Sequence, residues 1–180
     1  MAFRKKFKLA DGSEILIEQI TGREDVREFL RYINSFVKER APIFVDKPLS
    51  IKEEKEWFKT EIAANKSGKS IYLKLIANGR LIGTAMARRG HDNEDDNVEV
   101  GLGIIKEWRG KGLGRELLST AIALAKKRLK PKNIYLSAFE MNKRAIKLYK
   151  SLGFEMLANY PNWARHYGKY ENRLIMLLKK

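Results

Sequence analysis

Hydrophobic and polar residues alternate along residues 13–20, which predicts a strand with one buried face. Over residues 23–40 the apolar spacing becomes that of an amphipathic helix. The apolar stripe of this helix consists of Val26, Phe29, Leu30, Ile33 and Phe36. A second helix is predicted for about residues 51–64, because Ser50 followed by Glu53 is typical of a capping box.

The middle of the chain is predicted to form strands. Two apolar runs, residues 70–77 and 81–87, are joined by Asn78 and Gly79, the strongest short hairpin signal. After a polar connection, residues 98–105 form a third apolar run that contains two glycines. Glycine within a strand often marks a bulge or a close approach of another backbone, and we expect one of these at the third strand.

The last third of the chain alternates between helical and extended patterns. We expect a helix to about Lys130, a strand over 133–138, a helix over 142–152 and strands over 154–159 and 174–178. We expect a loop before the last strand, with Trp163, Arg165, His166, Tyr167 and Tyr170 either lining a binding pocket or covering the sheet. The whole order predicts one α/β domain over residues 1–180, with helices flanking a mixed sheet.

Composition narrows the function classes. The chain has no cysteine, which excludes disulfides, thiolate metal sites and a cysteine nucleophile, and fits a reducing, cytoplasmic setting. We find no apolar run long enough for a membrane span and no signal peptide, so we expect a soluble protein without a membrane partner. The net charge of +15 is spread over the whole chain, a pattern that favours a phosphate-bearing cofactor over a specific nucleic-acid partner.

The strongest chemical signal is the segment that follows the third strand. Its glycines, Gly110, Gly112 and Gly114, let consecutive N–H groups point at one anion, and the next helix adds its positive end. The spacing does not fit the triphosphate-binding or dinucleotide-binding patterns. What remains is R-x-x-G-x-G, with its arginine at Arg109. A flexible turn is the alternative interpretation for such a segment taken alone.

A second motif, N-x-x-A-x-x-L-Y-x-x-x-G-F, runs from Asn142 through Tyr149 to Phe154. On its own it is explained by a helix cap and by packing on the sheet. With the glycine segment before it, the chain resembles the GNAT superfamily of acetyl-CoA-dependent N-acetyltransferases over nearly its full length. The resemblance implies a mostly antiparallel sheet with a splayed strand pair that holds the cofactor.

The resemblance also implies roles for individual residues. The phosphates of acetyl-CoA would lie on the glycine segment, formed by Arg109, Gly110, Lys111, Gly112, Leu113, Gly114 and Arg115. The pantetheine arm would pair with the backbone of Leu102, Gly103 and Ile104, and Asn142 would contact the coenzyme. Tyr149 would be the general acid that protonates the departing thiolate.

Glu99 is the candidate base. It is a charged residue in an apolar strand and shares a face with Gly101 and Gly103. Either it takes a proton from the acceptor's ammonium, directly or through water, or it occupies an edge position facing solvent. Many superfamily members have a glutamate five positions before the residue that matches Ile104.

The acceptor is less defined by sequence. Ribosomal-protein N-terminal acetyltransferases carry a catalytic glutamate where this chain has Ser137, so the sequence favours a primary amine of a small molecule. An N-terminal or lysine protein acetyltransferase stays open, as does a non-catalytic CoA sensor or a basic nucleic-acid-binding module. The oligomeric state is also open, a homodimer included.

We predict no metal site. The acidic run Asp92 to Asp96 lacks the turn glycine of an EF-hand loop and is interpreted as a solvated connection. His91 and His166 are far apart in sequence, and neither is assigned a metal.

Overall fold

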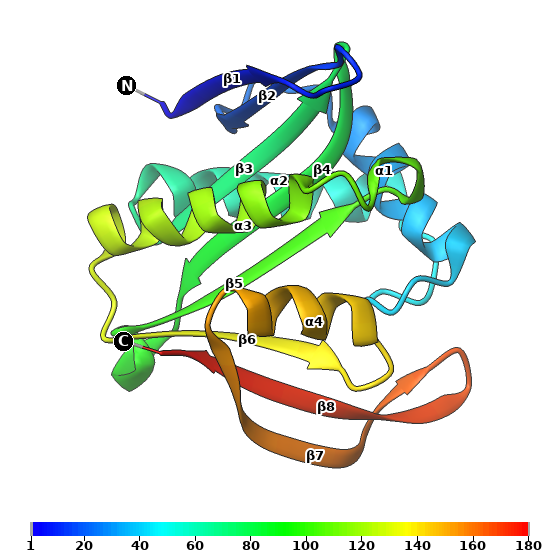
Figure 1. Cartoon of the computed structure of the whole chain (residues 1–180), viewed down its shortest axis with the longest axis vertical. Helices are drawn as coiled ribbons and strands as arrows, with labels where there is room; N and C mark the ends of the chain where they lie inside the picture. The colour runs from blue at the N-terminus through cyan, green and yellow to red at the C-terminus, as the bar shows by residue number, and fades with distance from the viewer. Residues whose placement is uncertain (1, 180) are drawn as a thin grey trace.

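The computed structural model describes residues 2–179, which form one eight-stranded sheet with four helices around it (Figure 1). The strands are β1 (Arg4–Lys8), β2 (Glu14–Gln19), β3 (Ser70–Ala77), β4 (Arg80–Arg89), β5 (Asn97–Ile104), β6 (Asn133–Phe139), β7 (Phe154–His166) and β8 (Lys169–Leu178). The helices are α1 (Val26–Glu39), α2 (Ile51–Lys66), α3 (Leu113–Leu124) and α4 (Lys143–Ser151). In the described part of the chain, no helix combines the length and apolar character needed to cross a membrane.

The strand order is β1-β2-β3-β4-β5-β6-β8-β7, and every neighbouring pair except β5 and β6 is antiparallel. The parallel pair is short, because its register runs only from Asn97 opposite Asn133 to Glu99 opposite Tyr135. Beyond Glu99 the two strands separate, while β5 stays paired with β4 as far as Ile104. The predicted mixed sheet and its splayed strand pair are therefore confirmed.

Helices cover both faces of the sheet. Figure 1 shows α3 in front of β3 and β4 and α2 behind them. Alternation along β5 gives each face its own contacts: Leu102 and Ile104 lie against α3, and Gly103 lies against α1. Strand β5 is thus contacted by α3 on one face of the sheet and by α1 on the other.

Local signals in the sequence are visible in the structure. The Ser50 hydroxyl accepts from the Glu53 N–H at 3.3 Å, and the Glu53 carboxylate accepts from the Ser50 N–H at 2.7 Å, so the capping box at the start of α2 is confirmed. Asn78 and Gly79 have φ values of 49° and 79°, the left-handed backbone of a tight hairpin turn.

The structure differs from the sequence prediction in three of its elements. Strand β1 was not expected, because four of its five residues are exposed and carry no alternating pattern. The helix after the glycine segment is α-helical only to Leu124 and then continues as a π-helical turn, Ala125–Leu129. The predicted loop over residues 163–170 is wrong: it forms the ends of β7 and β8, joined by a turn at Tyr167 and Gly168.

The length of β7 has a physical explanation. It is an edge strand whose residues between Phe154 and His166 are almost all exposed, so no hydrophobic alternation reveals it. An edge position also tolerates Pro161, because one side of the strand has no hydrogen-bonding neighbour. Main-chain pairing with β8, interrupted by two register shifts, holds the hairpin together.

A buried carboxylate ties α2 to the sheet. Glu61 is fully buried, accepts a hydrogen bond from the Ser70 hydroxyl at 2.6 Å and forms an ion pair with Arg88 on β4. We expect Glu61→Ala to lower the free energy of unfolding by about 2 kcal/mol or more, because Arg88 and Ser70 lose their partner. Urea unfolding measures this loss, with Glu56→Ala, an exposed position of the same helix, as the control. Equal stability of the two variants would contradict this role.

Candidate active site

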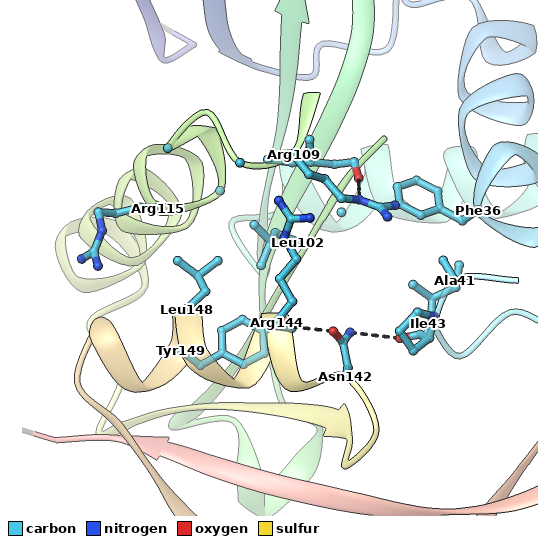
Figure 2. Close-up of a pocket in the computed structure, with 17 residues that line it drawn as sticks. Phe36, Ala41, Ile43, Leu102, Arg109, Arg115, Asn142, Arg144, Leu148 and Tyr149 are labelled. Carbon is cyan, nitrogen blue, oxygen red and sulfur yellow. Dashed lines mark hydrogen bonds between the residues drawn. The ribbon is translucent and has the colours of Figure 1, made fainter. Parts of the chain in front are cut away.

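A cavity of about 340 Å³ opens where β5 leaves β6 (Figure 2), and we call it the glycine-loop cavity. Ten of the site residues predicted from sequence line it: Leu102, Gly103, Ile104, Arg109, Gly110, Gly112, Gly114, Arg115, Asn142 and Tyr149. They come from β5, from the loop before α3, from the start of α3 and from α4. The structure thus brings the two sequence motifs together around one space.

The glycine loop has the backbone of an anion site. Gly110 and Gly112 have φ values of 85° and 78°, a left-handed conformation that side-chain-bearing residues rarely adopt. Gly112 is the N-cap of α3 and supplies no side chain to the first N–H groups of that helix. The first turn of α3 borders the cavity, and its N–H groups and dipole favour negative charge there.

Arg109 is held in place by protein groups. Its Nε donates to the Ile104 carbonyl at 2.7 Å, and its guanidinium forms an ion pair with Glu39 at the end of α1. This arrangement joins α1, β5 and the glycine loop, so Arg109 positions the loop in addition to lining the cavity.

Two predicted residues of the glycine segment lie outside the cavity lining. Lys111 is paired with Asp11 at 2.7 Å and lies over the Trp108 ring, on the outside of the loop. Leu113 is 1% exposed and belongs to the hydrophobic core. The Leu113 backbone nevertheless belongs to the first turn of α3, whose N–H groups could contact an anion.

Asn142 and Tyr149 lie on α4, beside β5. Asn142 caps the helix by accepting from the Ala145 N–H at 3.2 Å, and its amide donates to the Pro42 carbonyl at 3.3 Å. Tyr149 is 6% exposed and packs edge-on against Phe154, and burial raises the pKa of Tyr149 to about 12. Both residues therefore have the structural roles of a cap and a core contact, and both also face the cavity.

Sequence reasoning missed part of the cavity lining: Phe36, Ala41, Pro42, Ile43 and Arg144. Ala145 and Leu148 also line the cavity; they belong to the second motif but had no site role assigned. The segment after α1 has no motif, and only the fold carries it to α4. Arg144 could have been noticed, because it is a cation two residues after the motif's asparagine. Its guanidinium extends from α4 toward the glycine loop, 3.5 Å from where a Cβ of Gly110 would lie (Figure 2).

A second cavity, of about 420 Å³, lies on the α1 and α2 side of β5, and we call it the aromatic cavity. Its walls include Phe29, Tyr32, Trp57 and Tyr72, together with Glu54 and Arg88. It shares four lining residues with the glycine-loop cavity: Phe36, Ile43, Leu102 and Gly103. The two cavities therefore meet at β5.

Tyr32 fixes the geometry of this junction. Its hydroxyl donates to the Gly103 carbonyl at 2.9 Å and accepts from the Thr84 N–H at 3.1 Å. A Cβ on Gly103 would lie 2.6 Å from that hydroxyl, so only glycine allows the approach. This contact explains one of the two strand glycines that the sequence singled out.

Glu99 lies on the same face of β5 as Gly101 but outside the lining of the aromatic cavity. Its carboxylate accepts from the Ser137 hydroxyl at 3.1 Å, and that hydroxyl accepts from Arg173 at 3.0 Å. It borders a separate hollow with Arg88 and Tyr135. Glu99 and Gly103 are four strand residues apart, roughly 13 Å.

The aromatic residues of β7 and β8 line neither of these cavities. Trp163 and Tyr170 are exposed, while His166 is buried against Phe139. The Tyr167 hydroxyl donates to the Val37 carbonyl at 2.9 Å and so ties the hairpin to α1. Of the two predicted roles, covering the sheet holds only for His166, which packs on Phe139 of β6.

Relatives with similar sequences carry acetyltransferase names. A "Probable spermine N(1)-acetyltransferase" of Bacillus subtilis subsp. natto is 40% identical over 86 residues, which are 45% of this chain and 57% of the relative. The chain thus matches little more than half the length of that curated relative. An "L-methionine sulfoximine/L-methionine sulfone acetyltransferase" of Pseudomonas aeruginosa is 27% identical over 160 residues, 87% of this chain and 90% of the relative.

A solved structure shares the whole architecture. A Salmonella typhimurium protein assigned as an acetyltransferase, determined with its cofactor acetyl-CoA, superimposes with a TM-score of 0.79 at 25% identity. The match covers 92% of this chain and 93% of that protein. The sequence model of the Acetyltransferase (GNAT) family matches residues 32–154, which contain both motifs and most of both cavities. The chain therefore belongs to the Acetyltransferase (GNAT) family.

Proposed function

We propose that this protein transfers the acetyl group of acetyl-CoA to a primary amine of a small molecule, by direct attack within a ternary complex. The observation that carries the proposal is the meeting of two cavities at the splayed end of β5. One cavity ends at the glycine loop, and the other, on the opposite side of β5, is mostly apolar. Donor and acceptor can then approach the same strand from opposite sides.

The glycine-loop cavity fits the donor. The pyrophosphate is proposed to bind the N–H groups of residues 110–115, with Arg144 as an additional cation. The backbone of Leu102, Gly103 and Ile104 has no β6 partner. The Gly103 and Ile104 carbonyls accept from Tyr32 and Arg109, and the pantetheine arm is proposed to pair with the polar groups that remain along this edge. Asn142 lies where the arm would pass α4.

The proposed reaction forms one C–N bond and breaks one C–S bond. The neutral amine attacks the thioester carbonyl, whose oxygen is stabilised by strand N–H groups, and a tetrahedral intermediate results. The intermediate collapses by expelling the coenzyme A thiolate, and the Tyr149 hydroxyl supplies its proton. The proton that the attacking nitrogen loses then restores the Tyr149 phenol. Because burial raises the pKa of Tyr149 to about 12, this phenol is protonated at neutral pH.

Glu99 is proposed as the base for the amine, acting through water because it lies outside both cavities. We expect Glu99→Gln to lower kcat/KM about 10-fold or more at neutral pH, because the ammonium loses its proton acceptor. The loss should shrink at alkaline pH, where more of the free amine is neutral. Steady-state rates across pH measure this, with Glu94→Gln in the same hollow as the control. The alternative of an edge position is already wrong, because Glu99 pairs with both β4 and β6. An unchanged pH profile in Glu99→Gln would leave Glu99 with only its structural contact to Ser137.

A small-molecule acceptor is supported by the size and walls of the aromatic cavity. Its volume of about 420 Å³ is within the range of small-ligand sites, and its lining is mostly hydrophobic. The relatives named for spermine and for methionine sulfoximine also act on small amines.

The test is release of coenzyme A thiol from acetyl-CoA in the presence of individual amines, amino acids and peptides. We expect turnover that depends on a small amine and is absent without one. Faster turnover on peptides would instead support a protein acceptor. Binding of acetyl-CoA without turnover on any amine would support a non-catalytic sensor and overturn the proposal.

A further inference from the structure

The aromatic cavity contains a carboxylate without a counter-charge. Its charged lining residues are Glu54, in the first turn of α2, and Arg88 on β4. Glu54 is 3% exposed, and no ion pair or side-chain hydrogen bond joins its carboxylate to another residue in the range 2–179. A buried, unpaired carboxylate is costly for a protein, so its presence in a ligand-sized cavity calls for a ligand that compensates it.

Arg88 does not compensate Glu54, because it is paired with another group. Its guanidinium forms the ion pair with the fully buried Glu61. The backbone of Arg88 is also distant from the junction of the two cavities. It lies on β4 four residues from Thr84, the partner of Gly103, and this is roughly 13 Å along the strand.

The walls beside Glu54 favour a cation. Trp57, one turn further along α2, meets the Tyr72 ring edge-on with a centroid distance of 5.2 Å. Aromatic faces attract ammonium groups, most strongly where water is excluded. Both rings line the same cavity as Glu54, so they add to the attraction of its carboxylate.

We propose that Glu54 binds an ammonium group of the acceptor and selects alkylamines, diamines and polyamines over α-amino acids. This inference rests on the proposed function and adds its substrate class. An α-amino acid would bring its own carboxylate into a cavity whose charged groups, Glu54 together with the Arg88–Glu61 ion pair, already carry a net negative charge. A diamine or polyamine brings cations alone.

The ionisation of the residues that line the aromatic cavity supports this assignment. Burial raises the pKa of Glu54 to about 7. The other titratable groups around it are Tyr32 from α1, Tyr72 from β3 and Arg88 from β4, with Glu61 behind Arg88. Burial raises the pKa of both tyrosines further above their usual value, so they stay neutral. Glu54 is thus the cavity residue that gains its charge near neutral pH.

The direct test compares amines with their α-carboxylated counterparts: 1,5-diaminopentane with lysine, 1,4-diaminobutane with ornithine, and 3-methylthiopropylamine with methionine. We expect the wild-type protein to have a kcat/KM at least about 30-fold higher for the amine of a pair. In Glu54→Gln we expect the KM of the diamines to rise about 30-fold, while kcat changes much less and the values for amino acids stay within about threefold. Glu56→Gln, at an exposed position of the same helix, should match the wild type.

A thermal measurement shows that Glu54→Gln is folded and tests the uncompensated burial. Because the folded state binds the Glu54 proton more tightly than the unfolded state, stability is lost as the pH rises from about 5 to 8. We expect this part of the fall in Tm, about 3 °C or more, to be absent in Glu54→Gln. The same slope in both proteins would show that Glu54 is not strained in the free protein, and it would overturn the basis of the inference.

The outcomes separate this inference from the proposed function. If amines are acetylated but the carboxylated member of each pair is preferred, or if Glu54→Gln leaves the preference unchanged, the inference is wrong and the function stands. Turnover on other amines but on none of the three test amines would also overturn it. If no amine of any class is acetylated, the proposed function itself fails.

Discussion

Replacing Tyr149 by phenylalanine is expected to lower kcat about 100-fold or more, while the Kd for acetyl-CoA stays within about threefold of the wild type. The change removes one hydroxyl from a side chain that is 6% exposed and leaves its packing against Phe154 intact. Because the phenol is the proposed proton donor to the thiolate, its loss affects the chemical step and spares binding. Stopped-flow or steady-state thiol release, together with calorimetric titration of acetyl-CoA, measures both quantities.

The control for this substitution is Tyr160→Phe on β7, which removes the same atom from a tyrosine that is 41% exposed and outside both cavities. It should keep the wild-type kcat. If Tyr149→Phe kept wild-type turnover as well, Tyr149 would be only a core residue of α4, which is the interpretation that its burial alone allows.

Replacing Gly112 by valine is expected to raise the Kd for acetyl-CoA about 100-fold or more, equivalent to about 2.7 kcal/mol. Gly112 has a φ of 78° and adjoins the first turn of α3, where the N–H groups are proposed to bind the pyrophosphate. Valine disfavours this backbone conformation, and its side chain would stand beside the anion. Calorimetric titration of coenzyme A and acetyl-CoA measures the loss.

Gly68→Val is a matched control for backbone strain. Gly68 has a φ of 73° after α2, and, as at Gly112, an added Cβ would meet no atom within 4 Å. Both substitutions should therefore lower Tm by similar amounts, and only Gly112→Val should weaken coenzyme binding. Equal affinity in the two variants would mean that the loop is a structural turn and not the phosphate site.

The elements with strong periodic signals were predictable from sequence. The capping box at Ser50 and the hairpin at Asn78 are local features, because each depends on neighbours within a few residues. The glycines of β5 are visible in the sequence, but the contact that requires Gly103 comes from Tyr32, which is distant in the sequence. The end of β5, the glycine loop and the α4 motif together gave ten of the seventeen residues around the glycine-loop cavity. These residues share sequence motifs because they surround one space.

The other features depend on contacts distant in sequence. The segment at Ala41 to Ile43 lines the cavity and meets Asn142, a hundred residues away in the sequence, through the Pro42 carbonyl. Strand β7 is exposed, so its pairing leaves no hydrophobic pattern. In the sequence, Glu54 is an ordinary residue in the first turn of a helix. Only its burial at the aromatic cavity distinguishes it from the exposed Glu53.

The central claim is acetyl transfer from acetyl-CoA to an amine nitrogen within one ternary complex. The most direct measurement uses acetyl-CoA labelled with 13C in the acetyl group, with mass spectrometry of the amine, the coenzyme and the protein after turnover. The account predicts one labelled acetyl group on the amine for each coenzyme A released, with the protein itself unlabelled. Release of coenzyme A with labelled free acetate, or label held on the protein before it reaches the amine, would contradict it.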